Sequence, residues 1–221
     1  MIAQIPIEII LVLNHGVFHL TKIKIKKTKM KKLYLIYLSV LIAAGLVFAS
    51  GCCTPNATIG SQAVVLRPQE TSMWCWAASG EMCMEFLGAS VTQCDEANKR
   101  FGRNDCCNSP VPNACVNGGW PEFDKYGFTA TLTSNAALSW EDLKKQIYCA
   151  KKPFAFSWHW TGGGGHMMVV TGYAVINNVN YVSINDPWAP NVGNQRFITY
   201  AEYVSGSDHT HWNDYYNITK K

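Results

Sequence analysis

Residues 74–87 read WCWAASGEMCMEFL, and this stretch decides the fold. Its apolar positions 75, 78, 82 and 86 recur at the spacing of one helix face, and Gly88 follows as a stop signal. The pattern predicts a helix that buries one face and begins at a cysteine. Further helices are expected over 93–101, shortly after Gly118-Gly119, and over 139–149, where Ser139 and Asp142 form a capping box.

The second half of the chain changes from helical to extended character. Aromatic and β-branched residues dominate four short runs, separated by glycine and Asn-Asn turns: 153–160, 167–175, 180–185 and 195–200. A helical half followed by a strand-rich half predicts an α+β domain with two unlike parts. The groove between such parts is a natural place for a substrate.

Composition and charge limit the possible functions. The 221 residues are 48% apolar and 15% charged, so the chain can bury a sizeable core. We expect one domain over 62–205, after a linker at 53–61 and before a polar tail at 206–221. The net charge of +4 divides into +6 for residues 1–52 (seven lysines, one acid) and −2 for the remainder (twelve Lys and Arg, fourteen Asp and Glu). The folded part is not basic, which argues against a nucleic-acid partner.

Residues 30–52 have the anatomy of an export signal peptide. Two lysines, Lys31 and Lys32, precede the uncharged apolar run 33–49. The run ends at Ala49-Ser50-Gly51-Cys52, which resembles a bacterial lipoprotein signal. Cys52 is therefore expected to be lipidated and to anchor the protein in a membrane, with ordinary signal cleavage near Ala49 as the alternative.

The residues upstream of this signal, 1–29, do not fit it. Their apolar stretch is broken by Glu8, Asn14 and His15, and a lysine-rich run follows. We interpret them as an extension of the gene model and expect the natural start at Met30. The mature protein is expected to be exported, either as a lipoprotein of the cell envelope (outer membrane or cell surface) or freely secreted.

Nine cysteines agree with an oxidising compartment. Setting aside Cys52, Cys53 and Cys75 leaves six, enough for up to three disulfides in about 15 possible pairings. The competing interpretation is a zinc site made of Cys94, Cys106, Cys107 and Cys115. That set contains no CxxC pair, so disulfides are favoured and no metal is expected.

Cys75 differs from the other cysteines because it lies at the start of a predicted helix. The backbone N–H groups there favour a thiolate over a thiol. A thiolate nucleophile needs an imidazole partner, and His166 is the best candidate, because it follows four glycines and opens an apolar strand. His159 is expected in the core or groove wall, and His209 and His211 in the solvated tail.

The remaining parts of an acyl-transfer site can also be placed. Antiparallel pairing of 167–175 with 180–185 would bring Asp186 back to His166, where it would orient the ring. Asn185 is the rival for that role. The side-chain amide of Gln69, six residues before the cysteine, can help to stabilise an oxyanion.

These residues together resemble the papain-like cysteine peptidases. The motifs that carry the resemblance are Gln69, Cys75-Trp76-Ala77, Cys115 before Gly118-Gly119, His166 before a strand ending Gly172-Tyr173, and Ile184-Asn185-Asp186-Pro187-Trp188. The likeness spans residues 62–200 and is greatest to a compact bacterial branch similar to the plant-pathogen avirulence proteases. It implies a two-lobed fold, with a helical lobe carrying the nucleophile, an antiparallel β lobe, and the active site in the cleft between them.

The resemblance also implies a role for each matching residue. Cys75 would be the nucleophile, His166 the general base and acid, Asp186 the orienting group, and Gln69 part of the oxyanion hole. Gly118, Gly119 and Trp188 would bind substrate. One departure is Ser72, which stands where plant papains carry a cysteine, so Cys115 must find another partner or stay free.

The sequence thus predicts an exported, monomeric thiol peptidase that cleaves proteins or peptides through a thioester, without a cofactor. Trp120, Trp158 and Trp160 are expected to pack in the core or to shape a substrate pocket. One alternative is an amidase or transpeptidase of the same fold acting on cell-wall or other amide bonds. The other is a surface binding module without turnover.

Overall fold

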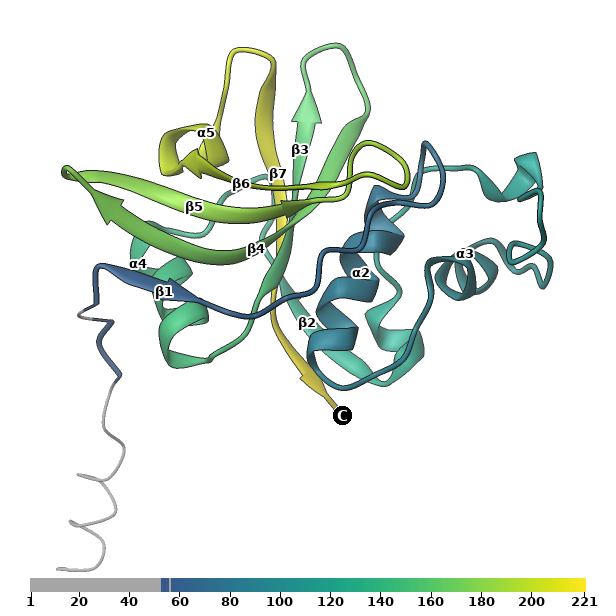
Figure 1. The fold of residues 1–221 in the computed structure, drawn as a ribbon, viewed down its shortest axis with the longest axis horizontal. Helices are drawn as coiled ribbons and strands as arrows, with labels where there is room; N and C mark the ends of the chain where they lie inside the picture. The colour runs from purple at the N-terminus through teal and green to yellow at the C-terminus, as the bar shows by residue number, and fades with distance from the viewer. Residues whose placement is uncertain (1–52, 56) are drawn as a thin grey trace, which may run out of the picture. The chain divides into compact units, whose positions relative to one another are not determined.

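An antiparallel sheet forms the centre of the protein in a computed structural model that describes residues 53–55 and 57–221 (Figure 1). Six strands follow one another across it in the order β2 (Phe128–Leu132), β7 (His209–Lys220), β3 (Phe154–Trp160), β4 (Gly165–Ile176), β5 (Val179–Asp186) and β6 (Asn194–Thr199). The short strand β1 (Ile59–Ser61) pairs with β4 as well. The proposals for residues 1–29, the signal peptide at 30–52 and lipidation of Cys52 lie outside the described residues.

The helices lie before the main strands in the chain and between them. They are α2 (Cys75–Phe86), α3 (Gln93–Phe101), α4 (Trp140–Lys144), the π-helical turn η3 (Lys145–Cys149) and α5 (Tyr200–Val204), with 3₁₀ turns η1 (Asn113–Cys115) and η2 (Phe123–Tyr126). Ser139 caps α4 through its hydroxyl, which accepts from the Asp142 N–H at 3.1 Å, as the capping box predicts. Within the described ranges, no helix has both the length and the apolarity to cross a bilayer.

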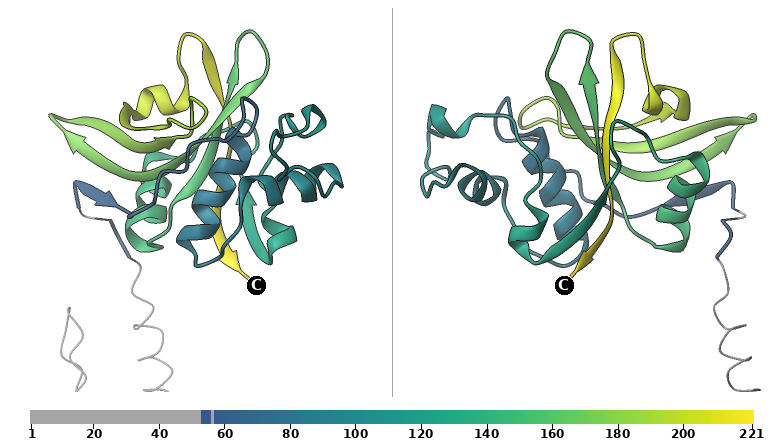
Figure 2. Two further views of the ribbon diagram at one scale, coloured as in Figure 1. Left: turned by 45° about the vertical axis from the view of Figure 1, so that its right-hand side comes forward. Right: turned by 180° about the vertical axis from the view of Figure 1, so that it is seen from behind.

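Side-chain alternation along β4 builds two cores, one on each face of the sheet. Met167 and Val169 pack with the buried face of α2, whereas Met168 and Val170 pack with α4, η3 and α5. Figure 2 shows α2 against one face of the sheet and α4 against the other. The expected α+β class is confirmed, with the cysteine helix in one part and the antiparallel strands in the other.

The predicted helices and strands are confirmed with small shifts at their ends, but two boundaries are wrong. Residues 206–221 are not a tail, because β7 pairs with both β2 and β3 inside the sheet. Residues 53–61 are not a free linker, because β1 pairs with β4 and Cys53 is bonded to Cys149. Long-range pairing of this kind cannot be read from local composition.

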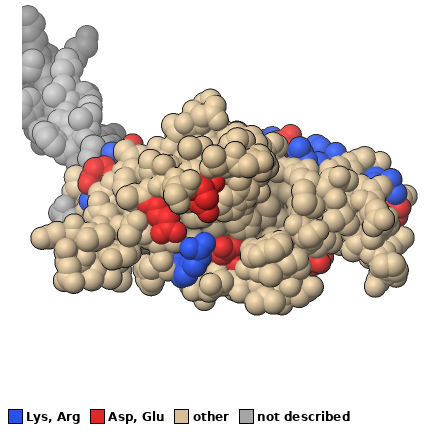
Figure 3. Space-filling view, turned by 90° about the horizontal axis from the view of Figure 1, so that it is seen from above, with Lys and Arg blue, Asp and Glu red and all other residues tan. Residues whose placement is uncertain are grey.

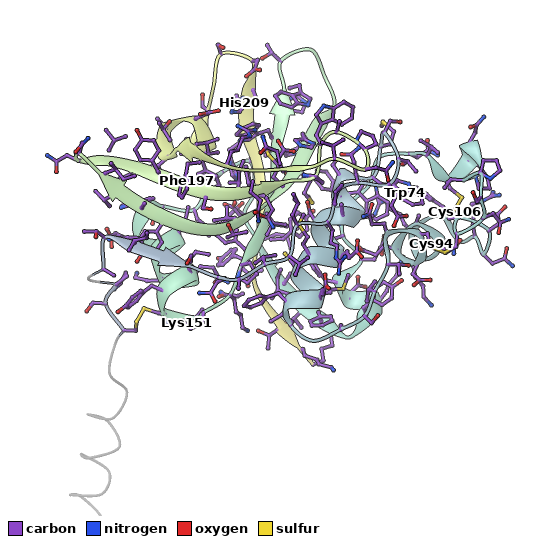
Figure 4. All side chains as sticks on the ribbon, viewed as in Figure 1. Trp74, Cys94, Cys106, Lys151, Phe197 and His209 are labelled. Atoms are coloured by element: carbon purple, nitrogen blue, oxygen red, sulfur yellow. A yellow bond between two sulfur atoms is a disulfide. The ribbon has the colours of Figure 1, made fainter. Side chains whose placement is uncertain are left out.

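Three disulfides join the described cysteines: Cys53–Cys149, Cys94–Cys107 and Cys106–Cys115. Figure 4 shows Cys94 and Cys106 close together at the outer end of the helical part. The prediction that Cys53 stays out of the disulfides is wrong, whereas Cys83 and Cys149 agree with the expectation that each serves packing or a disulfide. Cys83 is free and fully buried on α2, and all four cysteines of the zinc alternative are disulfide-bonded.

The Cys53–Cys149 bond gives the first testable prediction. It closes a 96-residue separation and holds the segment before β1 onto the domain. Replacing both cysteines by alanine should lower the free energy of unfolding by about 2–4 kcal/mol, because the unfolded chain regains the entropy of an open loop. Urea denaturation of the protein from Cys53 onward, with and without the pair, measures this. A midpoint that does not move would show that the segment behaves as a linker after all.

Candidate active site

Cys75 is the first residue of α2, and the two tryptophans beside it hold it in place. The indole N–H of Trp74 donates to the Cys115 carbonyl at 2.7 Å, and that of Trp76 donates to the Asn117 carbonyl at 3.1 Å. Both bonds tie the start of α2 to the segment that leads into Gly118-Gly119. Cys75 is a free, partly exposed cysteine whose helix end presents unpaired backbone N–H groups.

His166 comes from the start of β4 and meets Asp186 from the end of β5. The register pairs Val169 with Asn185, so Asp186 lies diagonally across from His166, within reach of a side chain. The His166 Nε2 and Asp186 Oδ1 atoms are 2.6 Å apart, and both side chains are about nine-tenths buried. The adjacent Asn185 faces elsewhere, donating to the Val64 carbonyl and accepting from Gln195.

Asp186 receives three hydrogen bonds in all. Besides His166, the Trp188 backbone N–H donates to Oδ1 at 3.0 Å and the Arg196 Nη2 group donates to Oδ2 at 3.1 Å. Burial favours the neutral acid, but these donors outweigh it and hold the pKa of Asp186 below its usual value. An ionised carboxylate only accepts, so the proton between the pair resides on Nε2 and leaves Nδ1 of His166 for Cys75.

The electrostatics of His166 follow from these contacts. Burial disfavours the charged ring, but the hydrogen bond with Asp186 and the nearby Cys75 thiol group favour it more strongly and raise the pKa of His166 to about 9. At neutral pH the ring is therefore an imidazolium. It can stabilise a thiolate at Cys75 and donate a proton to a leaving group.

Gln69 is buried beside this group and is held by the loop after Asp186. Its backbone N–H donates to the Pro187 carbonyl at 3.0 Å, and its carbonyl accepts from Asn191 at 2.9 Å. The side-chain Nε2 donates one hydrogen to the Thr71 carbonyl at 2.7 Å. No second acceptor for Nε2 is found among the described residues, and Oε1 of Gln69 is buried without a hydrogen-bond partner there.

One cleft of about 750 Å³ brings the predicted residues together. Cys75, His166, Asp186 and Gln69 all line it, and so do Gly118, Gly119 and Trp188. Trp188 is 54% exposed at this cleft. Six of the eight tryptophans of the chain contribute to its walls: Trp76, Trp120, Trp158, Trp160, Trp188 and Trp212.

The cleft also contains residues that the sequence analysis did not single out, and three of them matter for its charge and shape. Arg196 lies on β6 beside Asp186, Arg100 lies in the last turn of α3 beside Gly119, and Trp212 lies on β7. Gly165 needs its lack of a side chain here, because a Cβ would lie 2.5 Å from the Trp158 carbonyl and 3.0 Å from the Trp212 ring. The aromatic and β-branched residues of 209–220 were the one sequence feature that could have predicted a strand carrying Trp212.

The other histidines differ from expectation. His209 and His211 are buried, not solvated, because β7 is an inner strand. His209 stacks on Trp158 with ring centroids 3.7 Å apart, and the His211 Nδ1–H group donates to the Tyr203 carbonyl at 2.9 Å. His159 is exposed on β3 against Trp212, so the core or groove-wall assignment is wrong.

A cysteine at a helix start and a histidine–carboxylate pair on an antiparallel sheet share one cleft and define the candidate active site of an α+β domain. The chain belongs to the Peptidase_C39 like family, whose model matches residues 61–219. The finer likeness to avirulence proteases stays a prediction.

Solved structures with similar architecture include two from animals. One is digestive procathepsin L 3 of the Tenebrio molitor larval midgut, at 15% identity and TM-score 0.47, covering 75% of this chain and 71% of that one. The other comes from work on the mite allergens Blo t 1 and Der p 1, at 12% identity and TM-score 0.47, covering 76% and 73%. Among curated proteins, no sequence matches the chain.

The raised pKa of His166 is directly measurable. In ¹⁵N-histidine NMR of the protein from Cys53 onward, the His166 ring should titrate near pH 9, because Asp186 and Cys75 favour its charged form. Replacing Asp186 by asparagine removes a charge that favours the imidazolium, so the midpoint should fall toward the usual value of about 6.5. Replacing Cys75 by alanine should lower it as well. A midpoint that stays unchanged in both variants would contradict the coupling.

Proposed function

We propose that this protein is an exported cysteine peptidase that hydrolyses peptide bonds through a thioester acyl-enzyme. Cys75 is the nucleophile, His166 the general acid and base, and Asp186 the group that orients the ring. Gln69 and the Cys75 backbone N–H stabilise the oxyanion. The observation that carries the proposal is the 2.6 Å contact between His166 and Asp186, in a cleft that also holds a free cysteine at a helix start.

The geometry supports a two-step reaction. The Cys75 thiolate attacks the substrate carbonyl carbon, forming the C–S bond, and the resulting oxyanion accepts hydrogen bonds from Gln69 and backbone. The His166 imidazolium gives its Nδ1 proton to the leaving nitrogen as the C–N bond breaks. Water then attacks the thioester while His166 takes a proton from it, and the C–S bond breaks to release the acid and restore the thiolate.

Two observations support the proposal that the protein is exported. Three disulfides agree with an oxidising compartment, and the signal-like run at 33–49 precedes them. Lipidation at Cys52 would keep the enzyme at the cell envelope, and a protein or peptide is the expected substrate. Mass spectrometry of the N-terminal peptide from cells tests the lipid and the start site together.

The nucleophile can be tested against a matched control, since the described part of the chain has two free cysteines. Cys75→Ala should abolish cleavage of a peptide library and labelling by a thiol-directed epoxide. Cys83→Ala should leave both nearly unchanged, because burial raises the pKa of the Cys83 thiol and keeps it inert. Mass spectrometry of the labelled peptide identifies the modified residue. Labelling confined to another residue, or cleavage by Cys75→Ala, would refute the proposal.

The roles of His166 and Asp186 predict unequal losses. By analogy with hydrolytic triads, His166→Ala should lower kcat on the order of 10⁶-fold and Asp186→Ala on the order of 10⁴-fold, because Asp186 transfers no proton. In the wild type, kcat/KM should fall as pH rises through about 9, where His166 loses its proton. In Asp186→Asn, this alkaline limb should move to lower pH. Little or no loss in Asp186→Ala together with an unmoved limb in Asp186→Asn would remove Asp186 from the triad.

Adding an amine acceptor distinguishes hydrolysis from the alternative, in which the acyl group is transferred to an amine. Adding a free amine to the reaction should leave the acid as the main product if the enzyme is a peptidase. A new amide in its place would assign the same residues to a transpeptidase. Uniform inertness of Cys75 to the epoxide would instead favour a binding module.

A further inference from the structure

We infer that Arg100 makes the cleft selective for a substrate carboxylate beside the Gly118-Gly119 rim, an inference that rests on the proposed peptidase activity. The carboxylate can belong to an acidic side chain or to the C-terminus of the peptide. Arg100 lies in the last turn of α3, lines the cleft with the catalytic group and has a side chain that is 29% exposed.

Three contacts position the Arg100 guanidinium at this rim. Its central carbon lies 5.6 Å from the ring centroid of Trp76, the residue after the nucleophile. Its Nη1 group donates to Glu122 Oε1 at 3.0 Å. Gly119 lies directly against it, since a Cβ on Gly119 would be 2.4 Å from Nε and 2.7 Å from the Trp76 ring. The glycine therefore lets the guanidinium reach the cleft wall.

The hydrogen-bonding capacity of Arg100 is mostly unused. Arg67 and Arg103 each grip a carboxylate through the Nε and Nη2 edge, at 2.9 and 2.6 Å on Glu85 and at 2.8 and 2.6 Å on Asp105. Among the described residues, no acceptor occupies the same edge of Arg100. That two-donor edge matches the geometry of a carboxylate.

The charges around the cleft leave a positive excess at Arg100. Its partner Glu122 is shared with Lys125, whose Nζ lies 2.8 Å from Oε2, so the three side chains together carry +1. The other two cations of the cleft, His166 and Arg196, both pair with Asp186, at 2.6 and 3.1 Å, and Arg196 also lies 3.8 Å from Glu202. Asp186 is the one carboxylate among the residues that line the cleft.

The surroundings of Arg100 strengthen its electrostatic interaction with a bound anion. Seen from the end at which the β3–β4 loop lies, much of the surface carries no Lys, Arg, Asp or Glu side chain, and several acidic side chains gather beside one basic group (Figure 3). The cleft walls are largely tryptophan. An ionic hydrogen bond in such a weakly polar cleft is screened less than one at an open surface. A peptide carboxylate is thus the group that would complement Arg100.

The test compares pairs of peptides that differ only in charge. Starting from one cleaved library peptide, glutamate and glutamine are exchanged at each position around the cleaved bond, and the C-terminus is prepared as the free acid and the amide. We expect the charged member to be preferred about tenfold in kcat/KM at one position, which corresponds to one good charged contact. The position that responds tells a side-chain carboxylate from a C-terminal one.

Variants of Arg100 then test whether this side chain causes the preference for the charged peptide. Arg100→Gln should reduce the charged-to-neutral ratio to near one, and Arg100→Lys, which keeps the charge without the planar fork, should leave an intermediate ratio. Arg103→Gln is the matched control, because Arg103 pairs with Asp105 outside the cleft and should leave the ratio unchanged. Added salt should weaken the wild-type preference.

The charged-to-neutral ratio of kcat/KM distinguishes a role of Arg100 in specificity from a purely structural role. If Arg100 only supports the rim, Arg100→Gln and Arg100→Lys lower kcat/KM equally for both peptides of a pair and the ratio stays, which overturns the inference. Cleavage without any charge preference overturns it while leaving the peptidase proposal intact. Failure to cleave any peptide, with Cys75 inert to the epoxide, overturns both.

Discussion

The arrangement of the candidate active site depends on one ionic hydrogen bond, between His166 and Asp186 at 2.6 Å. The bond fixes which ring nitrogen carries the proton toward the carboxylate and so directs the other nitrogen to Cys75. Its two residues come from adjacent antiparallel strands, and the cysteine comes from a helix packed on the same sheet. The two cores on either side of β4 hold these elements in register, so the site inherits the rigidity of the sheet.

The segment around Cys75 shows how the sequence serves this geometry. Trp74 and Trp76 bury large rings on the domain core while their N–H groups hold the backbone of residues 115–117. The Cys106–Cys115 disulfide joins the same segment to the turn after α3, and the next residue of that turn, Cys107, is bonded to Cys94 on α3. The rim of the cleft is therefore positioned by the residues that flank the nucleophile, and Arg100 adds the contact from α3.

Local pattern was sufficient for the elements with strong periodicity. The helix at 75–86, the four strands of the second half and the cysteine, histidine and aspartate followed from spacing, turn residues and the order of the motifs. The β7 strand escaped notice because Asn, Asp and His interrupt its aromatic residues, and their burial depends on partners far away in sequence. The Cys53–Cys149 bond and the position of the Arg100 side chain in the cleft likewise result from tertiary packing, which no local rule reveals.

The central claim is that one thiol and one imidazole act together on a carbonyl carbon in this cleft. A crystal structure of the protein with a peptide aldehyde tests it most directly. The account predicts a covalent bond from the Cys75 sulfur to the aldehyde carbon, with the oxygen toward the Gln69 amide and the ring of His166 alongside. An aldehyde bound without that bond, or attached to another residue, would contradict it.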